Sequence, residues 1–316
     1  MIKKSRRVPG RFFYLFCLRV VVLMCLCAVF LMAQSGGIIT KDQKAKEAVD
    51  AAIKAIGGAD KIGNIKSLII KGTTILSFID GFVLPNGMTP KSPPPEEFEI
   101  RILLPDSFLK ITTNSNNIQL YRGVSQGILI PPIMAGRLAP DSKSSQEAPI
   151  TGDVAIIVNH QTNIKIDEWL HFLVGMLMKT GASPVTISSG STSGVFTLTK
   201  KDGSLGEIEF DSKTCYPSAI RYKKPEMPPL PGGSILVGGD LRGGSSSVAS
   251  GLKKPDHDEI RFQDRFSVNG IMLPRIITTF DAETMFTTEL RIREALINPE
   301  LSLKDFGLPN SKMSPR

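Results

Sequence analysis

The chain has 316 residues, of which 41% are hydrophobic, and it contains 38 Lys and Arg against 30 Asp and Glu. This length suffices for one large domain or two small ones, and the composition is that of a globular protein. Six of the basic residues and none of the acidic ones lie in the first 35 positions, so the remainder carries a net charge of about +2. This balance, and the lack of a basic patch interleaved with aromatic residues, argue against a nucleic-acid-binding protein.

The first 35 residues have the pattern of a secretory signal peptide. Residues 3–11 form a basic head, and residues 20–32 form an apolar run shorter than the ~20 residues of a comfortable membrane span. Ala33 and Ser35 are the small residues that a signal peptidase reads. We predict cleavage after Ser35 and a periplasmic or secreted mature chain. The alternative is an uncleaved N-terminal segment that anchors the protein.

Helical and extended patterns alternate in the first half of the mature chain. Residues 41–56 carry a one-sided apolar stripe that predicts an amphipathic helix, ended by Gly57 and Gly58, and residues 59–65 predict another helical turn or two. Residues 67–78 are rich in β-branched side chains and predict a long strand. Short strands are expected at residues 97–104, 108–113 and 118–122, and the more apolar stretch 126–134 is another candidate strand.

A second helical region is predicted over residues 153–179. Apolar residues cover almost every side of its stretch 169–178, so this part must be buried. The polar residues 159–163 predict a break into two helices.

The second half of the chain repeats a hairpin pattern. Strands are predicted near residues 185–188 and 195–200, in a hairpin over residues 207–222, and at 260–263, 276–280 and 286–293. Asn269-Gly270 is a strong hairpin turn. Residues 225–255 are rich in Gly, Pro and Ser and predict a flexible insert.

Together these elements predict an α+β fold in one domain, residues 36–316. A single antiparallel sheet of roughly ten strands must curl, and helices are the natural filling of its concave face. We therefore expect a curved antiparallel sheet that forms an incomplete β-barrel and covers two or three helices.

Several motifs, in this order along the chain, resemble the bacterial periplasmic lipoprotein-carrier superfamily, the LolA-, LolB- and LppX-like outer membrane lipoprotein-sorting proteins. The matching stretches are Ala55-Ile56-Gly57-Gly58, Ile65-Lys66-Ser67-Leu68, Lys71-Gly72-Thr73, Phe210-Asp211-Ser212-Lys213-Thr214-Cys215-Tyr216-Pro217, Val268-Asn269-Gly270-Ile271-Met272-Leu273-Pro274 and residues 298–306. The resemblance implies an incomplete β-barrel over helices with an apolar cavity that can take acyl chains. The chain departs from the family in a Pro-rich loop at residues 85–95, in its Gly-rich insert and in its longer middle helical region.

The alternation of apolar with charged residues predicts which side chains share the dry side of the sheet. Together with the helix around Trp169, these residues are the candidate ligand-binding set of a hydrophobic cavity. The set is Phe98, Ile100, Ile102, Trp169, Phe172, Met176, Phe210, Ile260, Phe262, Phe286, Leu290 and Ile292. The same positions would form a closed core if no cavity exists.

No residue pattern predicts an enzyme, a cofactor or a metal site. His160 and His171 are too far apart for a pair on one helix face, and no Gly-rich stretch ends in the Gly-Lys-Ser/Thr of a phosphate loop. The densest group of potential metal ligands, residues 256–259, is expected to be a solvated charge run.

Two functions follow from this reasoning. The first is a carrier that shelters an acyl chain, with a lipid or an acylated protein as its cargo, possible envelope proteins as partners, and a monomeric state. The second is a non-enzymatic envelope scaffold or interaction protein with a filled core.

Overall fold

The computed structural model describes residues 37–78, 91–105, 107–112, 118–122, 128–129, 153–225 and 255–306. The predicted signal peptide lies outside these residues, and so does the predicted insert except for its two end residues, Pro225 and Pro255.

All strands of the described residues belong to one sheet of 13 strands. Their bounds are β1 Ile38–Thr40, β2 Ser67–Phe78, β3 Glu96–Leu103, β4 Ser107–Thr112, β5 Ile118–Arg122, β6 Ile128–Leu129, β7 Val185–Ser189, β8 Val195–Lys200, β9 Gly203–Phe210, β10 Pro217–Tyr222, β11 Asp258–Val268, β12 Ile271–Asp281 and β13 Phe286–Ile297. The order across the sheet is β1-β7-β8-β9-β10-β11-β12-β13-β2-β3-β4-β5-β6. Its two end strands, β1 and β6, do not pair with each other, so the sheet is open.

The α+β class and the curved, incomplete barrel are confirmed. Every described strand pair is antiparallel except β1 with β7, which run parallel, so the sheet is mixed. β1 was not predicted, because a segment of three residues, Ile-Ile-Thr, is too short to show a period. β1 is an edge strand, held by its register with Val185 to Ile187.

The first two helices follow the predicted pattern. α2, Gln43–Ile56, begins where the Asp42 carboxylate accepts a hydrogen bond from the Ala45 amide at 2.9 Å. It ends at Gly57, whose φ of 150° suits glycine alone. Its buried stripe of Ala45, Val49, Ala52 and Ile56 belongs to the main hydrophobic core. α3, Ala59–Gly63, is a single short turn that leads into β2.

The predicted break in the second helical region is wrong. α5 is one continuous helix of 25 residues, Asp153–Leu177. Polar residues such as Asn and Thr cost a helix interior well under 1 kcal/mol each, far less than Pro, so they do not interrupt a helix whose neighbours are stable. The helix ends at Met178, which has a φ of 49° and donates its amide to the Val174 carbonyl.

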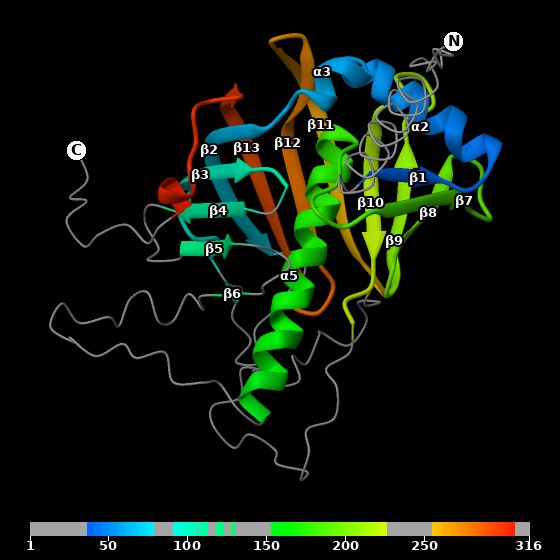
Figure 1. Ribbon diagram of the computed structural model, residues 1–316. Coiled ribbons are helices and arrows are strands. Elements are labelled where there is room, and N and C mark those ends of the chain that lie inside the picture. The colour runs from blue at the N-terminus through cyan, green and yellow to red at the C-terminus, as the bar shows by residue number, and fades with distance from the viewer. Residues whose placement is uncertain are drawn as a thin grey trace, which may run out of the picture.

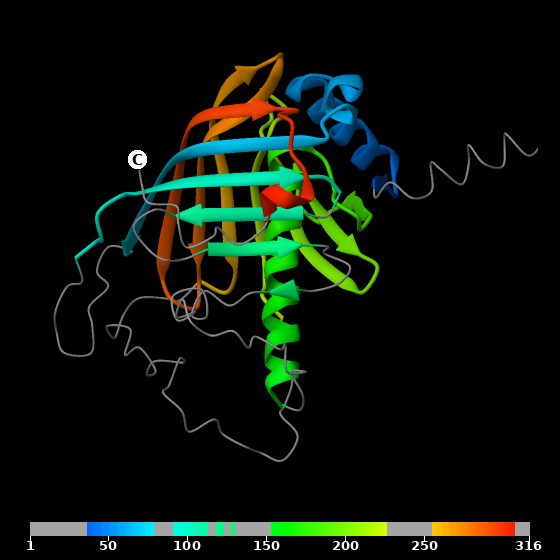
Figure 2. The ribbon, with the colours of Figure 1, turned by 60° about the vertical axis from the view of Figure 1, so that its left-hand side comes forward.

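α5 lies along the concave side of the sheet, which curves around it (Figures 1 and 2). Its C-terminal part is buried among the side chains of the main core. Gly175 fixes the closest approach, because a Cβ atom at this position would lie 2.0 Å from the Phe262 ring of β11. The helix is therefore seated directly against the middle of the sheet.

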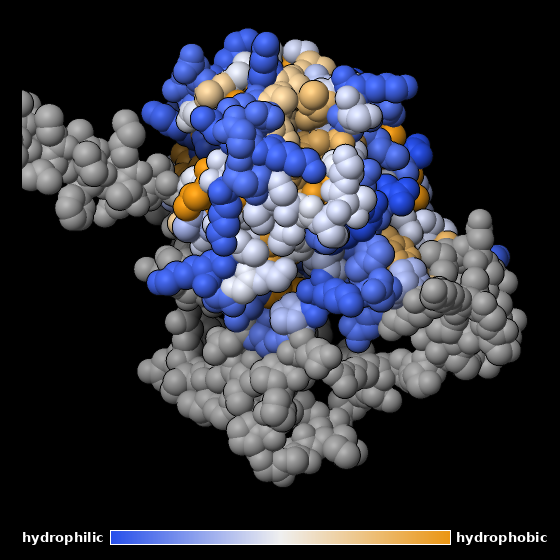
Figure 3. Space-filling view, turned by 90° about the vertical axis from the view of Figure 1, so that its right-hand side faces the viewer, coloured by the Kyte–Doolittle hydropathy of each residue, from blue (hydrophilic) through white to orange (hydrophobic). Residues whose placement is uncertain are grey.

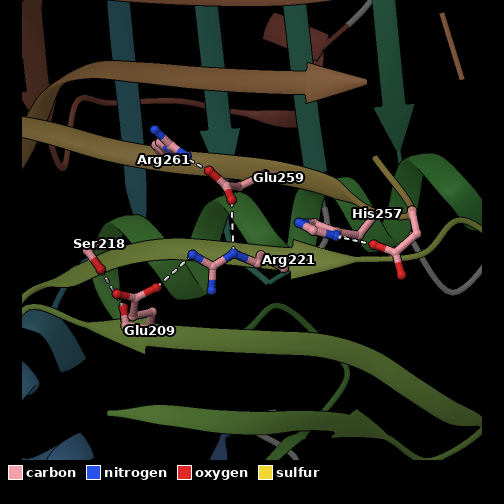
Figure 4. A network of polar contacts seen from close by, with 7 residues as sticks. Glu209, Ser218, Arg221, His257, Glu259 and Arg261 are labelled. Carbon is pink, nitrogen blue, oxygen red and sulfur yellow. Dashed lines mark hydrogen bonds and ion pairs between the residues drawn. The ribbon is translucent and has the colours of Figure 1, made fainter. Parts of the chain in front are cut away.

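The outer face of the sheet is polar in its middle. Figure 4 shows Glu209, Arg221, Glu259 and Arg261 joined across β9, β10 and β11 on the face turned away from α5. Arg221 lies 2.8 Å from the Glu209 carboxylate and 2.9 Å from that of Glu259. At β3 and β4 the short 3₁₀ helix η1, Leu303–Phe306, covers the outer face, where Phe306 packs on Leu109.

The side of the molecule that faces right in Figure 1 is mostly hydrophilic, with hydrophobic side chains in small separate areas (Figure 3). The main hydrophobic core of the described residues is buried, with side chains of α2, α5 and the sheet packed together in it. Among the described residues, no helix has both the length and the apolar character needed to cross a membrane.

Candidate functional site

An apolar pocket of about 120 Å³ lies between α5 and the concave face of the sheet. It is lined by Ile100, Phe108, Lys110, Glu168, Trp169, Phe172, Tyr222, Ile260, Thr279 and Leu290. The residues come from α5, from β3 and β4 on one flank, and from β10 to β13 on the other. Because strand side chains alternate, each of these strands turns one set of side chains into the pocket and the other set outward.

Aromatic rings form the helix side of the apolar pocket. The Trp169 ring lies 4.2 Å from the Phe108 ring between centroids, tilted by 46°, and 5.8 Å from the Phe172 ring in a stacked arrangement. Aromatic pairs at these separations stabilise each other beyond their area burial. The Nε1–H of Trp169 is buried and has no hydrogen-bond partner among the described residues. This wall therefore consists of packed aromatic rings and contains one unused donor.

Five of the twelve predicted cavity residues line this pocket: Ile100, Trp169, Phe172, Ile260 and Leu290. Six others are buried in the core without lining it: Phe98, Ile102, Met176, Phe210, Phe262 and Ile292. Phe286 is half-buried and packs edge-on against Phe78, with 4.7 Å between ring centroids. That any of these residues binds a ligand stays a prediction.

Five pocket residues were missing from the predicted set: Phe108, Lys110, Glu168, Tyr222 and Thr279. Phe108 and Lys110 lie on one face of β4, opposite Ile102 and Ile100 of β3, and this two-residue period could have identified them. Tyr222 follows Ile220 by the same period. Glu168 and Thr279 are polar, so nothing in the sequence distinguished them from solvent-facing residues.

A second, polar pocket of about 310 Å³ lies on the other flank of α5, against β8, β9 and β10. Its lining residues are His160, Asn163, Ile164, Asp167, His171, Lys200, Asp202, Gly203, Ser204, Leu205, Tyr222, Lys223, Lys224 and Pro225. Tyr222 lines both pockets, so they adjoin at this ring.

The lysines of the polar pocket are matched by carboxylates. Lys200 lies 2.6 Å from Asp167 on α5, and Lys224 lies 2.6 Å from Asp281 and 3.4 Å from Asp258. Burial raises the pKa of Asp167 in spite of the nearby Lys200 ammonium group. The pocket is therefore polar but has little uncompensated positive charge.

His171 is the buried polar group of this pocket. Its side chain is 1% exposed, its Nε2 lies 2.6 Å from the Leu205 carbonyl, and its ring lies 4.2 Å from the Tyr222 ring. A carbonyl only accepts, so Nε2 carries the proton. Burial lowers the pKa of His171 to about 4, and the ring is neutral at pH 7. Nδ1 is then an acceptor, and it has no partner among the described residues.

A third, shallow groove of about 480 Å³ lies on the outer face of the sheet, over the start of β11 and the end of β12. It includes His257 and Glu259 of the charge run at residues 256–259. Asp256 contacts His257 at 2.7 Å, Asp258 accepts from the Ala282 amide at 2.6 Å, and Glu259 pairs with arginines. Within the described part of the chain, no group of three or more His, Cys, Asp or Glu side chains could hold a metal ion.

No family model and no curated protein match this sequence. Among solved structures, the chain is similar to a LolA superfamily protein from Nitrosomonas europaea, with 12% identity, a TM-score of 0.43, and coverage of 83% of this chain and 97% of that one. It is also similar to a putative outer membrane lipoprotein-sorting protein domain from Vibrio parahaemolyticus (11%, TM-score 0.39) and to a DUF1329 family protein from Desulfovibrio piger (9%, TM-score 0.39). Both cover the same shares of the two chains.

These solved structures include the superfamily that the sequence motifs resemble.

Proposed function

We propose that the protein is an extracytoplasmic carrier that binds an acyl chain in the apolar pocket between α5 and the concave face of the sheet. The observation that supports this most directly is the pocket itself, walled by Trp169 and Phe172 of α5 and by apolar side chains of the sheet, namely Phe108, Ile100, Ile260 and Leu290. The lipoprotein carriers that the sequence resembles place acyl chains in a cavity of this kind.

The driving force is burial of apolar surface. Each methylene group removed from water contributes about 0.8 kcal/mol. An apolar cavity of about 150 Å³ is large enough to bind benzene. The pocket of about 120 Å³ is slightly smaller than that, so it has room for the end of an acyl chain but not for a complete chain. A complete chain would fit only if α5 shifted away from the sheet.

A scaffold with a filled core is the second candidate, and one observation favours it. The Phe262 ring fills the space beside Gly175, and Phe98, Ile102 and Met176 are buried without lining the pocket. The predicted cavity is thus largely occupied by the protein's own side chains in this state.

A pair of substitutions on β12 tests the carrier function. Thr279 lines the apolar pocket, whereas its neighbour Thr278 lines the groove on the outer face. Thr279→Phe should fill the pocket and weaken binding of palmitate by about tenfold or more, while Thr278→Phe should leave binding unchanged. The measurement is the fluorescence of Trp169, the one tryptophan of the chain, during titration with palmitate.

Mass spectrometry of the native protein, purified from the cell envelope, tests whether it carries a bound lipid. A carrier should yield bound lipid, and the mass of the intact chain should correspond to a start at Gly36. A titration without a saturable response, combined with no lipid recovered, would leave the scaffold as the better account. The N-terminal pattern supports the location outside the cytoplasm, and the resemblance supports an acylated protein as a possible cargo.

A further inference from the structure

We propose that the polar pocket is a headgroup site that receives a neutral, hydroxyl-bearing headgroup, of the glycerol or sugar kind, from the lipid whose acyl chain enters the apolar pocket. This inference rests on the proposed carrier function and adds the class of lipid. The ligand would then be an amphiphile that contacts both flanks of α5.

The two pockets are placed to serve one molecule. Successive residues of an α-helix are about 100° apart, so Trp169 and His171 point to roughly opposite flanks of α5. Trp169 lines the apolar pocket and His171 lines the polar one. The Tyr222 ring lines both pockets and packs on the His171 ring at 4.2 Å, so the pockets meet at this side chain.

The size of the polar pocket suits a small headgroup. Its volume of about 310 Å³ is more than twice that of the apolar pocket and reaches the lower end of the ~300–1,000 Å³ that ligand pockets occupy.

The chemistry of the polar pocket favours hydroxyl groups over anions. An anion would have to compete with Asp167 for Lys200 and with Asp281 for Lys224, at contacts of 2.6 Å in both pairs. The acceptor Nδ1 of His171, by contrast, has no partner in the described structure, and a ligand O–H group would supply one.

Binding requires a small rearrangement. Nδ1 is buried in the free protein, so a headgroup reaches it only when side chains around the His171 ring move, and the Tyr222 ring packs on it at 4.2 Å. Because Tyr222 also lines the apolar pocket, its movement joins the two pockets into one site. A purely apolar ligand would leave Nδ1 without a partner, which is the physical reason for a headgroup preference.

The first experiment compares four probes on the wild-type protein, followed by Trp169 fluorescence and by calorimetry. Lauric acid monoglyceride carries two hydroxyl groups, methyl laurate carries none, and laurate and dodecyl phosphate are anions with chains of similar length. We expect the monoglyceride to bind about tenfold more tightly than methyl laurate and more tightly than either anion. Equal affinities of the monoglyceride and methyl laurate, or tighter binding of dodecyl phosphate, would overturn the headgroup assignment and leave the carrier function standing. Binding of none of these probes would overturn both.

Two substitutions of His171 separate a ligand role from a structural one. In His171→Gln the amide nitrogen takes the place of Nε2 and keeps the hydrogen bond to Leu205, but the acceptor at Nδ1 is lost. In His171→Asn the amide oxygen takes the place of Nδ1, and the bond to Leu205 is lost. We expect His171→Gln to reduce the preference for the monoglyceride about fivefold to tenfold and His171→Asn to keep it. Equal effects of the two variants on this preference would assign His171 to structure alone. The probe comparison on the wild-type protein stands even where a variant fails to fold.

Discussion

The two flanks of α5 differ in how they satisfy burial. On one flank, Trp169 and Phe172 face Ile100 and Leu290, and apolar contact is the main interaction. On the other flank, Asp167 pairs with Lys200 and His171 bonds to a backbone carbonyl. α5 therefore has an apolar side and a polar side, and the same sheet covers both.

This difference explains why the helix shows no single apolar stripe. A surface helix concentrates its apolar residues on one side, whereas a helix enclosed by a curved sheet needs partners in several directions. The polar groups on the second flank are tolerated because strands β8 and β9 bring Lys200 and the Leu205 carbonyl to meet them. Substitutions that add or remove a charge on each flank test whether the two flanks differ in this way.

The largest effect is expected from a charge on the apolar flank. Ile100 is 2% exposed and lines the apolar pocket, so Ile100→Glu would bury a carboxylate. Lys110 lies opposite on β4, but an ion pair at a buried site does not repay the cost of removing both charges from water. We expect a loss of about 4 kcal/mol or more in the free energy of unfolding. Urea unfolding followed by Trp169 fluorescence and circular dichroism measures this loss.

The matched change on the other flank is Asn163→Glu. Asn163 is exposed on α5 and lines the polar pocket, so a carboxylate there stays in water. Its cost should stay within about 0.5 kcal/mol. Equal costs for Ile100→Glu and Asn163→Glu would show that the two flanks do not differ as described.

Much of the fold was predictable from residue periods alone. Phe98, Ile100 and Ile102 of β3 alternate with charged residues, and all three are buried, because a strand's two faces have different surroundings. The continuity of α5 was not predictable in this way, because local propensity at residues 159–163 is weak and the packing of the rest of the helix outweighs it.

The polar pocket could not be predicted from the sequence either. His171 lies 34 residues from Leu205 and, considered alone, is a single polar residue in an apolar run. Its partner appears only when β9 is laid against α5. The apolar pocket was found in part, because Ile100, Ile260 and Leu290 share a face by period, whereas Glu168 and Thr279 carry no such signal.

On the polar flank, we expect the free energy of unfolding to depend on pH through His171. His171 has a pKa of about 4 in the folded protein, lowered by burial, against 6.5 in the unfolded chain. Above pH 6.5 the ring is neutral in both states. Between pH 6.5 and 4 the unfolded chain binds a proton that the folded protein does not, so stability falls as the pH falls. Below pH 4 both states are protonated and this contribution changes no further. The total loss from His171 should be about 3 kcal/mol.

His171→Gln isolates this contribution. Gln does not titrate and keeps a donor for the Leu205 carbonyl, so the variant should lose about 3 kcal/mol less than the wild type between pH 6.5 and 4. Carboxylates elsewhere affect both proteins equally and cancel in the difference. Superimposable curves of unfolding free energy against pH for the two proteins would mean that His171 is not a buried neutral ring.

The smallest effect is expected where the polar flank holds its ion pair. The side chains of Asp167 and Lys200 are 14% and 17% exposed, and burial raises the pKa of Asp167 although Lys200 lies 2.6 Å away. An acid with a raised pKa is less stable as a carboxylate in the folded state, so removing its charge relieves a cost. In Asp167→Asn the amide oxygen still accepts a hydrogen bond from Lys200. The Lys200 ammonium group also retains a carboxylate nearby, that of Asp202 at 3.9 Å. We expect a change below about 1 kcal/mol in the free energy of unfolding at pH 7, measured with urea.

The reciprocal change Lys200→Met should cost more, because it leaves the Asp167 carboxylate buried without its cation. If Asp167→Asn proved the more damaging of the two, the pair would be a net source of stability, and the polar flank would be as intolerant of change as the apolar one.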